Sequence, residues 1–250
     1  MRAQEFTTET LGQGGLAYEQ NVYTAMQAAK IEGLDLGDKP TAGFSNVGYG
    51  DIEATYNGKP FNIEIKASAN DQMGGTSFRY EMAGQKFIPV GQIEPDELDM
   101  LLQAAEVKAG DIDNFLKAAQ KYENNPNITG FPVRVTKDTR EKLKADGLQK
   151  AVASNISAKS SFIIKHYNKK QVYYIQVGGA GLFYMGKNPL NLPVPELQGD
   201  INIELRVGYG GSGGKPTVSA GIRLQGRLKT ENVSNFTLDD PGSIQALFMQ

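Results

Sequence analysis

The chain of 250 residues contains no cysteine and only one histidine. Without cysteine, the sequence excludes disulfides, zinc ribbons and thiolate catalysis, and it carries no redox signature of a compartment. The single histidine, His166, excludes His-Asn-His metal sites and argues against a Ser-His-Asp triad. Its neighbours in segment 162–167 instead predict that it lies on a strand.

No apolar run approaches the ~18 residues that a membrane span requires, and the first residues lack the apolar segment of a signal peptide. We therefore expect an intracellular, cytoplasmic protein without a membrane partner. With 40% hydrophobic residues, a chain of this length can bury a full core. The composition is that of one large domain, or of a core with an appended unit.

Two short segments, 51–56 and 61–66, alternate between apolar and polar residues as half-buried strands do. The apolar positions form a core face: Ile52, Ala54, Tyr56, Phe61, Ile63 and Ile65. Because side chains of a strand point to opposite faces in turn, the ionisable groups gather on the other face.

Asn57-Gly58 lies between the two segments and favours a type I′ turn, whose central residues need positive φ. A two-residue turn there would set Asp51 directly opposite Glu64. A four-residue loop, which Pro60 allows, would pair Glu53 with Glu64 and leave the faces unchanged.

Two carboxylates directly across a ladder repel each other unless a cation neutralises them. Mg²⁺ takes carboxylate oxygens, keeps several waters and favours bound phosphate. Asp51 and Glu64, with the Lys66 ammonium nearby, therefore predict a site for phosphodiester hydrolysis. The alternative is an ordinary amphipathic hairpin with a solvated polar face.

A helix is predicted from Leu16 to about Lys30, ending near Gly33, because its apolar residues recur at helical spacing. Glu19 lies within that apolar stripe. A carboxylate facing the core is costly unless it is paired or metal-bound, so we expect Glu19 to point into a polar pocket between helix and sheet. A buried arginine partner, or a place at the edge of the stripe, would also explain it.

With Glu19, Asp51 and Glu64-Ile65-Lys66 in this order, residues 14–70 resemble the PD-(D/E)XK nuclease superfamily, the fold of many restriction endonucleases and Holliday-junction resolvases. That family places an acidic residue on its first helix, an Asp at the head of one strand and Glu-x-Lys on the next. The proline that names the motif is absent, since Gly50 precedes Asp51.

The resemblance implies that Asp51, Glu64 and the backbone carbonyl of Ile65 hold Mg²⁺, which Mn²⁺ can replace. Lys66 would orient or activate the attacking water, and Glu19 would bind a second ion or its water. The implied function is a Mg²⁺-dependent DNA endonuclease, with a homodimer expected where both strands are cut. A junction resolvase, an exonuclease, or an inactive nucleic-acid-binding or virion-associated protein are the alternatives.

The net charge of −2 hides an uneven distribution along the chain. Residues 1–129 hold 10 Lys and Arg against 19 Asp and Glu, whereas residues 130–230 hold 16 against 6. A basic middle region is what phosphate-backbone binding would use, and an internal acidic partner is the alternative. The candidate DNA-binding residues are Lys137, Arg140, Lys142, Lys144, Lys165, Lys169 and Lys170.

The remaining patterns predict helices near 95–108, 112–123 and 137–153, with Pro95 and Asp111 at helix starts. Strands are expected at 131–135, 162–167, 172–177, 182–185, 201–207 and 218–228. The glycine-rich segment 208–215 lacks the Lys-Ser or Lys-Thr end of a phosphate loop and predicts a hairpin loop. This order indicates an α/β fold with an α+β mixed sheet: a restriction-endonuclease-like core in 1–130 and a basic, β-rich region in 131–250, which completes the sheet or forms a DNA-recognition unit.

Overall fold

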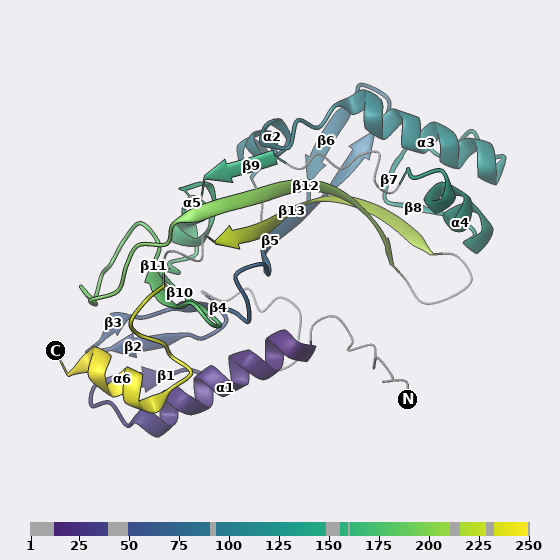
Figure 1. The fold of residues 1–250 in the computed structure, drawn as a ribbon. Coiled ribbons are helices and arrows are strands. Elements are labelled where there is room, and N and C mark those ends of the chain that lie inside the picture. Colours follow the sequence, from purple (N-terminus) through teal and green to yellow (C-terminus); the bar gives the residue numbers. More distant parts are fainter. Residues whose placement is uncertain are drawn as a thin grey trace, which may run out of the picture. The chain divides into compact units, whose positions relative to one another are not determined.

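The computed structural model describes residues 13–39, 50–90, 94–148, 156–159, 161–210, 216–228 and 233–249 (Figure 1). The chain divides into two compact units. Unit 1 comprises Met1–Asp71, Lys159–Asp200 and Gly226–Gln250, and unit 2 comprises Gln72–Ala158 and Ile201–Gln225. The chain therefore passes between the units four times, whereas the sequence suggests one boundary near residue 130. The difference arises because strands distant in the sequence pair with each other, which composition does not reveal.

Unit 1 combines two small sheets with helices. Its helices are α1 (Gln13–Ala29), α5 (Ser161–Lys169) and α6 (Pro241–Phe248), and its strands are β1 (Leu34–Leu36), β2 (Ala54–Tyr56), β3 (Lys59–Pro60), β4 (Ile63–Lys66), β10 (Tyr174–Val177) and β11 (Gly181–Tyr184). One three-stranded sheet has the order β1-β2-β3 and a second has the order β11-β10-β4. This mixture of helices with parallel and antiparallel strands confirms the α+β class.

The tight turn between β2 and β3 is the one that the sequence predicts. Asn57 and Gly58 have φ of 50° and 75°, and Tyr56 pairs with Lys59. An antiparallel bridge joins Ile52 to Ile63 in the same register. The two-residue turn is therefore correct and the four-residue loop is not. Asp51 lies just before this paired segment, and its backbone N–H, like that of Ile52, donates to the Ile63 carbonyl.

The core face of this hairpin is also as predicted. Ile52, Phe61 and Ile63 are fully buried, and they pack with Val22 and Met26 of α1. Leu238, Ile244 and Leu247 from the C-terminal segment complete the same cluster. One apolar core therefore fixes α1, the hairpin and α6 relative to one another within unit 1.

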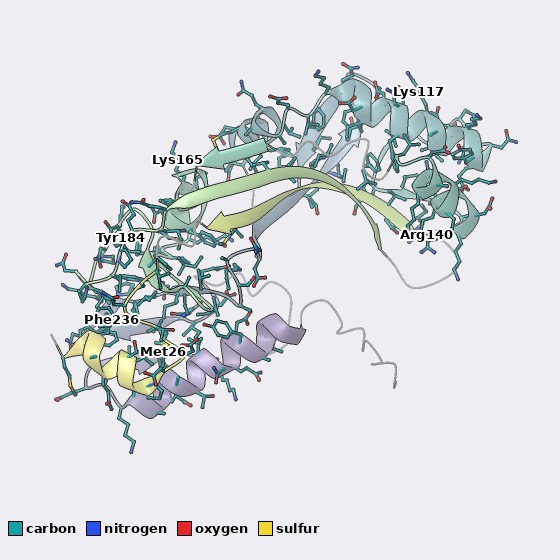
Figure 2. All side chains as sticks on the ribbon, in the orientation of Figure 1. Met26, Lys117, Arg140, Lys165, Tyr184 and Phe236 are labelled. Atoms are coloured by element: carbon teal, nitrogen blue, oxygen red, sulfur yellow. The ribbon has the colours of Figure 1, made fainter. Side chains whose placement is uncertain are left out.

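Segment 162–167, including His166, lies in helix α5, so the strand predicted there is wrong. A short apolar run cannot distinguish a strand from a buried helix by periodicity alone. The helix buries Tyr167 and leaves Lys165 and Lys169 exposed (Figure 2). The chain returns through β10, which runs parallel to β4 and places Gln176 beside Ile65.

Unit 2 is built on a larger, mainly antiparallel sheet. Its strands are β5 (Gln72–Glu81), β6 (Lys86–Pro89), β7 (Gly130–Phe131), β8 (Val133–Arg134), β9 (Ile156–Lys159), β12 (Gly199–Gly210) and β13 (Thr217–Leu228), and its helices are α2 (Pro95–Ala104), α3 (Ala109–Glu123) and α4 (Lys137–Ala145). The main strand order is β6-β5-β13-β12-β9 (Figure 1). Phe78 and Tyr80 are buried on the face that α3 covers, where the Tyr80 hydroxyl donates to Asp113 Oδ1 at 2.7 Å.

Helix boundaries in unit 2 differ from the predictions in detail. Pro95 does open α2, but Lys108 rather than Asp111 is the N-cap of α3, and Asp111 lies in its first turn. Helix α4 ends at Ala145, with Thr136 as its capping side chain. The end of the predicted helix, residues 149–153, and most of the loop 208–215 fall outside the described residues. Among the described residues, no helix is long and apolar enough to cross a membrane.

Candidate functional site

Helix α1 carries Glu19 just before two apolar positions that face the core. Val22 and Met26 are buried one and two turns further along, while Glu19 itself is partly buried. Burial raises the pKa of the Glu19 carboxyl, the Lys66 ammonium lowers it, and the Glu64 carboxylate raises it again. Glu19 therefore lies within electrostatic reach of the Glu-x-Lys strand, as the apolar stripe predicts.

Asp51 is held at the end of the hairpin by the backbone of β4. Its backbone N–H donates to the Ile63 carbonyl at 3.0 Å, and its Oδ2 accepts from the Ile65 N–H at 2.7 Å. The preceding residue, Gly50, lies so close to β4 that an added Cβ would stand 2.8 Å from the Ile63 carbonyl oxygen. A residue without a side chain is therefore needed immediately before Asp51.

Glu64 and Lys66 form an ion pair in which Lys66 Nζ lies 2.5 Å from Glu64 Oε1. The side chains are 13% and 15% exposed, so the pair is largely desolvated. The buried hydroxyl of Tyr167, on α5, donates to the same Oε1 at 2.9 Å. Burial and the Glu64 carboxylate raise the pKa of Tyr167, which keeps its hydroxyl protonated as a donor.

The Glu64 carboxylate and burial act together on the proton affinity of Asp51. Burial and the Glu64 carboxylate raise the pKa of Asp51 to about 7, although Lys66 and the Ile65 N–H act in the opposite direction. For Lys66, burial lowers the pKa, but Glu64 and Asp51 outweigh that effect and the net shift is upward. The four predicted side chains Glu19, Asp51, Glu64 and Lys66 thus form one interacting group in unit 1.

The oxygen atoms of Asp51, Glu64 and Ile65 are of the kind that bind a hard cation. Ile63 uses both its N–H and its carbonyl toward segment 51–52, and the Lys66 carbonyl accepts from Gly178 beyond β10. Because backbone groups alternate between the two edges of a strand, we infer that the Ile65 carbonyl lies on the Asp51 edge of β4. Two carboxylates and one carbonyl oxygen are ligands that Mg²⁺ accepts.

No group of three or more His, Cys, Asp or Glu side chains that could hold a metal ion occurs among the described residues. The set that the resemblance implies is smaller, because it contains the carboxylates of Asp51 and Glu64 and a backbone carbonyl. Glu19 would act through a second ion or its water. The Mg²⁺ site therefore stays a prediction.

The sequence reasoning missed two polar residues beside the site. Tyr167 was hidden in a segment interpreted as a strand. Gln176 is fully buried on β10, where its Nε2 donates to the Tyr18 hydroxyl at 3.0 Å and to Thr237 Oγ1 at 2.9 Å. A glutamine within the apolar run 172–177 was a signal, since a buried amide needs partners.

These bonds belong to a wider network that ties the C-terminal segment to α1. The Tyr18 hydroxyl donates to Asp239 Oδ2 at 2.7 Å, and Gln176 Oε1 accepts from the Leu238 N–H at 2.9 Å. Tyr18 lies directly before Glu19 on α1. The network therefore fixes the part of α1 that presents Glu19.

The candidate DNA-binding residues fall into two separate groups. Lys137, Arg140, Lys142 and Lys144 do lie on one helix, α4 of unit 2, whereas Lys165, Lys169 and Lys170 lie on and just after α5 of unit 1. Figure 2 labels one residue of each group, Arg140 and Lys165. On α4, Lys142 pairs with Asp138 at 2.6 Å and Arg140 with Glu141 at 2.7 Å. This pairing reduces the positive field of the helix.

The charge asymmetry along the chain does not persist between the units. Unit 1 holds 12 Lys and Arg against 15 Asp and Glu, and unit 2 holds 14 against 13. The basic stretch 130–230 is shared between both units, and the acidic helices α2 and α3 belong to the same unit as α4. A uniformly basic DNA-recognition unit is therefore not formed.

Comparison of the chain with protein-family models, with curated proteins and with solved structures finds no match. The geometry of the site and the resemblance of its motif are thus the basis for a functional assignment.

Proposed function

We propose that this protein is a Mg²⁺-dependent endonuclease that hydrolyses DNA phosphodiester bonds. The observation that carries the proposal is the grouping of Glu19 on α1, Asp51 just before β2, and Glu64 and Lys66 on β4. These residues are spread over 48 positions of the chain, from 19 to 66, yet charges within the group shift the pKa values of Glu19, Asp51 and Lys66. Their order and types are those of the PD-(D/E)XK motif.

The electrostatics support a cation-binding role. Lys66 partly neutralises Glu64, but burial and the remaining negative charge leave Asp51 with a pKa of about 7. A group of buried carboxylates with too little positive charge is an arrangement that a divalent cation stabilises. When bound, Mg²⁺ lowers the pKa of a coordinated water and stabilises charge on the phosphate.

The protein's own residues have distinct roles in this proposal. Asp51 and Glu64 provide carboxylate oxygens, and Ile65 provides its carbonyl. Lys66 keeps its proton because its pKa is raised, so it supplies a hydrogen-bond donor and a positive charge that orient the attacking water. Tyr167 holds Glu64 in place through Oε1.

One observation favours a second candidate, a nucleic-acid-binding or virion-associated protein without catalysis. Glu64 Oε1 already accepts hydrogen bonds from Lys66 and Tyr167, so this carboxylate is satisfied without a metal ion. A buried ion pair of this kind also serves as a structural element. Cleavage assays distinguish the two candidates.

The test is incubation of plasmid, linear and branched DNA with the purified protein in Mg²⁺, in Mn²⁺ and in EDTA. Lys66→Ala removes the ammonium from the site, and Lys59→Ala removes an exposed lysine from the same hairpin as a matched control. We expect metal-dependent cleavage by the wild type and by Lys59→Ala, with a loss of about 100-fold or more in Lys66→Ala. The choice among the three DNA forms separates an endonuclease from an exonuclease or a junction resolvase.

Absence of metal-dependent cleavage of all three substrates by folded protein would overturn the enzymatic assignment. Equal cleavage by Lys66→Ala and wild type would also overturn it, because the activity would then not depend on this site. Sedimentation of the protein alone and with DNA tests the expected homodimer.

A further inference from the structure

Lys66 is a largely buried cation in direct contact with Glu64. Its Nζ lies 2.5 Å from Glu64 Oε1, and the Lys66 and Glu64 side chains are 15% and 13% exposed. The ion pairs on α4, by contrast, join side chains that are at least 30% exposed. Solvent therefore screens the charges of Lys66 and Glu64 much less than those on α4.

The Lys66 ammonium acts on all three carboxylates of the site. It lowers the pKa of Glu19 and of Asp51, and it contacts Glu64 directly. In return, the carboxylates raise the pKa of Lys66 against the effect of burial, so the lysine keeps its positive charge. A positive charge shared among several carboxylates is the role that a bound metal ion has in such a group. Lys66 thus supplies charge of the kind that a metal ion supplies.

One oxygen of Glu64 accepts from a charged donor and from a neutral donor. Oε1 accepts from Lys66 Nζ at 2.5 Å and from the Tyr167 hydroxyl at 2.9 Å. A divalent cation bound by this carboxylate would lie in place of the ammonium or close beside it. Two positive charges at such a separation repel each other strongly where burial excludes water. The neutral Tyr167 hydroxyl exerts no such repulsion, so the two donors should affect a cation differently.

We propose that Lys66 competes with the divalent cation for Glu64 and so limits the affinity of this protein for Mg²⁺. The inference rests on the proposed function for the choice of Asp51 and Glu64 as ligands. When no metal ion is bound, Lys66 is the counter-ion of the carboxylates, and the same charge opposes the entry of a metal ion. Loss of the lysine should therefore strengthen Mg²⁺ binding while it weakens cleavage, two effects of opposite sign.

Two substitutions at position 66 remove the charge in different ways. Lys66→Met keeps an unbranched side chain that suits a buried position, and Lys66→Gln keeps a neutral N–H donor. Tyr167→Phe is the matched control, because it removes the neutral hydrogen bond from the same oxygen of Glu64. Lys59→Met removes an exposed lysine of the same unit and controls for long-range charge.

Binding of Mg²⁺ to each protein without DNA is measured by isothermal titration calorimetry. A pH of about 8.5 limits the competition of protons for the carboxylates. Circular dichroism in EDTA and in Mg²⁺ verifies the folding of each variant. Cleavage is measured separately, so the affinity for the cation does not depend on any activity.

We expect both Lys66 variants to bind Mg²⁺ at least about tenfold more tightly than the wild type. Removal of a unit charge beside a divalent ion changes their interaction by more than this factor, even at an effective dielectric constant of about 20. Tyr167→Phe and Lys59→Met should stay within about threefold of the wild type, since neither removes a charge from Glu64. If a Lys66 variant is unfolded in EDTA, Mg²⁺ should restore its circular dichroism spectrum, because the cation supplies the missing positive charge.

A smaller gain or weaker Mg²⁺ binding in a folded Lys66 variant would overturn the proposal. An equal gain in Tyr167→Phe would also overturn it, because the hydrogen bond rather than the charge would then limit the affinity. The same conclusion would follow if neither the wild type nor the Lys66 variants bound Mg²⁺, or if both variants stayed unfolded in its presence.

These outcomes are independent of the nuclease proposal. Cleavage by the wild type, together with unchanged Mg²⁺ affinity in the Lys66 variants, contradicts only the competition between lysine and cation. Tighter Mg²⁺ binding by these variants, without any cleavage by the wild type, contradicts only the nuclease proposal.

Discussion

Replacement of Asp51 by asparagine should stabilise the protein at alkaline pH when no divalent cation is present. In the folded protein the Asp51 pKa is about 7, against an ordinary value of 3.8. The folded state therefore binds an additional proton between about pH 4 and about pH 7, and the free energy of unfolding falls as pH rises through this window. Asparagine carries no charge, and its side-chain oxygen can still accept from the Ile65 N–H.

The size of the effect follows from the difference between the two pKa values. A difference of about 3 units corresponds to about 4 kcal/mol of destabilisation when the carboxyl is fully ionised. Asp51→Asn removes this destabilisation, but the asparagine amide adds a buried donor, which lowers the free energy of unfolding by about 1–3 kcal/mol if it finds no partner. That cost does not depend on pH, so the change between about pH 5 and about pH 8 is the more reliable quantity, and it amounts to about 2.5 kcal/mol.

Urea unfolding in EDTA at about pH 5 and about pH 8 measures this change for the wild type and for Asp51→Asn. Asp38→Asn, at an exposed carboxylate of unit 1, is the matched control and should change stability by less than about 0.5 kcal/mol at either pH. Mg²⁺ should then stabilise the wild type and have little effect on Asp51→Asn. A stability difference between Asp51→Asn and wild type that is the same at both pH values would refute the conclusion that burial and Glu64 raise the pKa of this carboxyl.

Further variants test the parts of unit 1 that support the site. Gly50→Ala should lower the free energy of unfolding by about 1–3 kcal/mol, because the added Cβ meets the β4 backbone. Gly14→Ala, which has open space around it on α1, should leave the free energy of unfolding unchanged or raise it. Equal effects of the two substitutions would contradict this prediction. Gln176→Leu should lower the free energy of unfolding, measured in urea, by about 2–4 kcal/mol, because it leaves several buried polar partners unsatisfied. A decrease below about 0.5 kcal/mol would argue against a stabilising role of the Gln176 hydrogen bonds. Tyr167→Phe should reduce DNA cleavage by about tenfold with an unchanged circular dichroism spectrum, because Glu64 loses one of the donors that hold it, and full activity would exclude that role.

The local features around the hairpin were accessible from sequence because they depend on neighbours. Asn57-Gly58 has one turn type that fits both residues, and once the turn is fixed, alternation assigns every side chain of the two strands to a face. The apolar stripe of α1 identified Glu19 for the same reason, since a helix repeats every 3.6 residues.

Segment 162–167 shows where sequence reasoning fails. Its apolar and basic residues fit a strand as well as one turn and a half of helix. The tertiary structure decides for the helix, from which the Tyr167 hydroxyl donates to Glu64. The charge split along the chain was misleading for a related reason. It assumed that neighbours in sequence belong to one unit, whereas β5 and β13 join across more than 130 residues.

The sequence alone determined the candidate site of this protein: the turn, the alternation and the stripe are local, and together they select Glu19, Asp51, Glu64 and Lys66. Only the tertiary structure decided which other groups surround them, because long-range strand pairing and helix docking are set by the burial of the whole core. That packing brought Tyr167 and Gln176 to the site and divided the basic residues between two units.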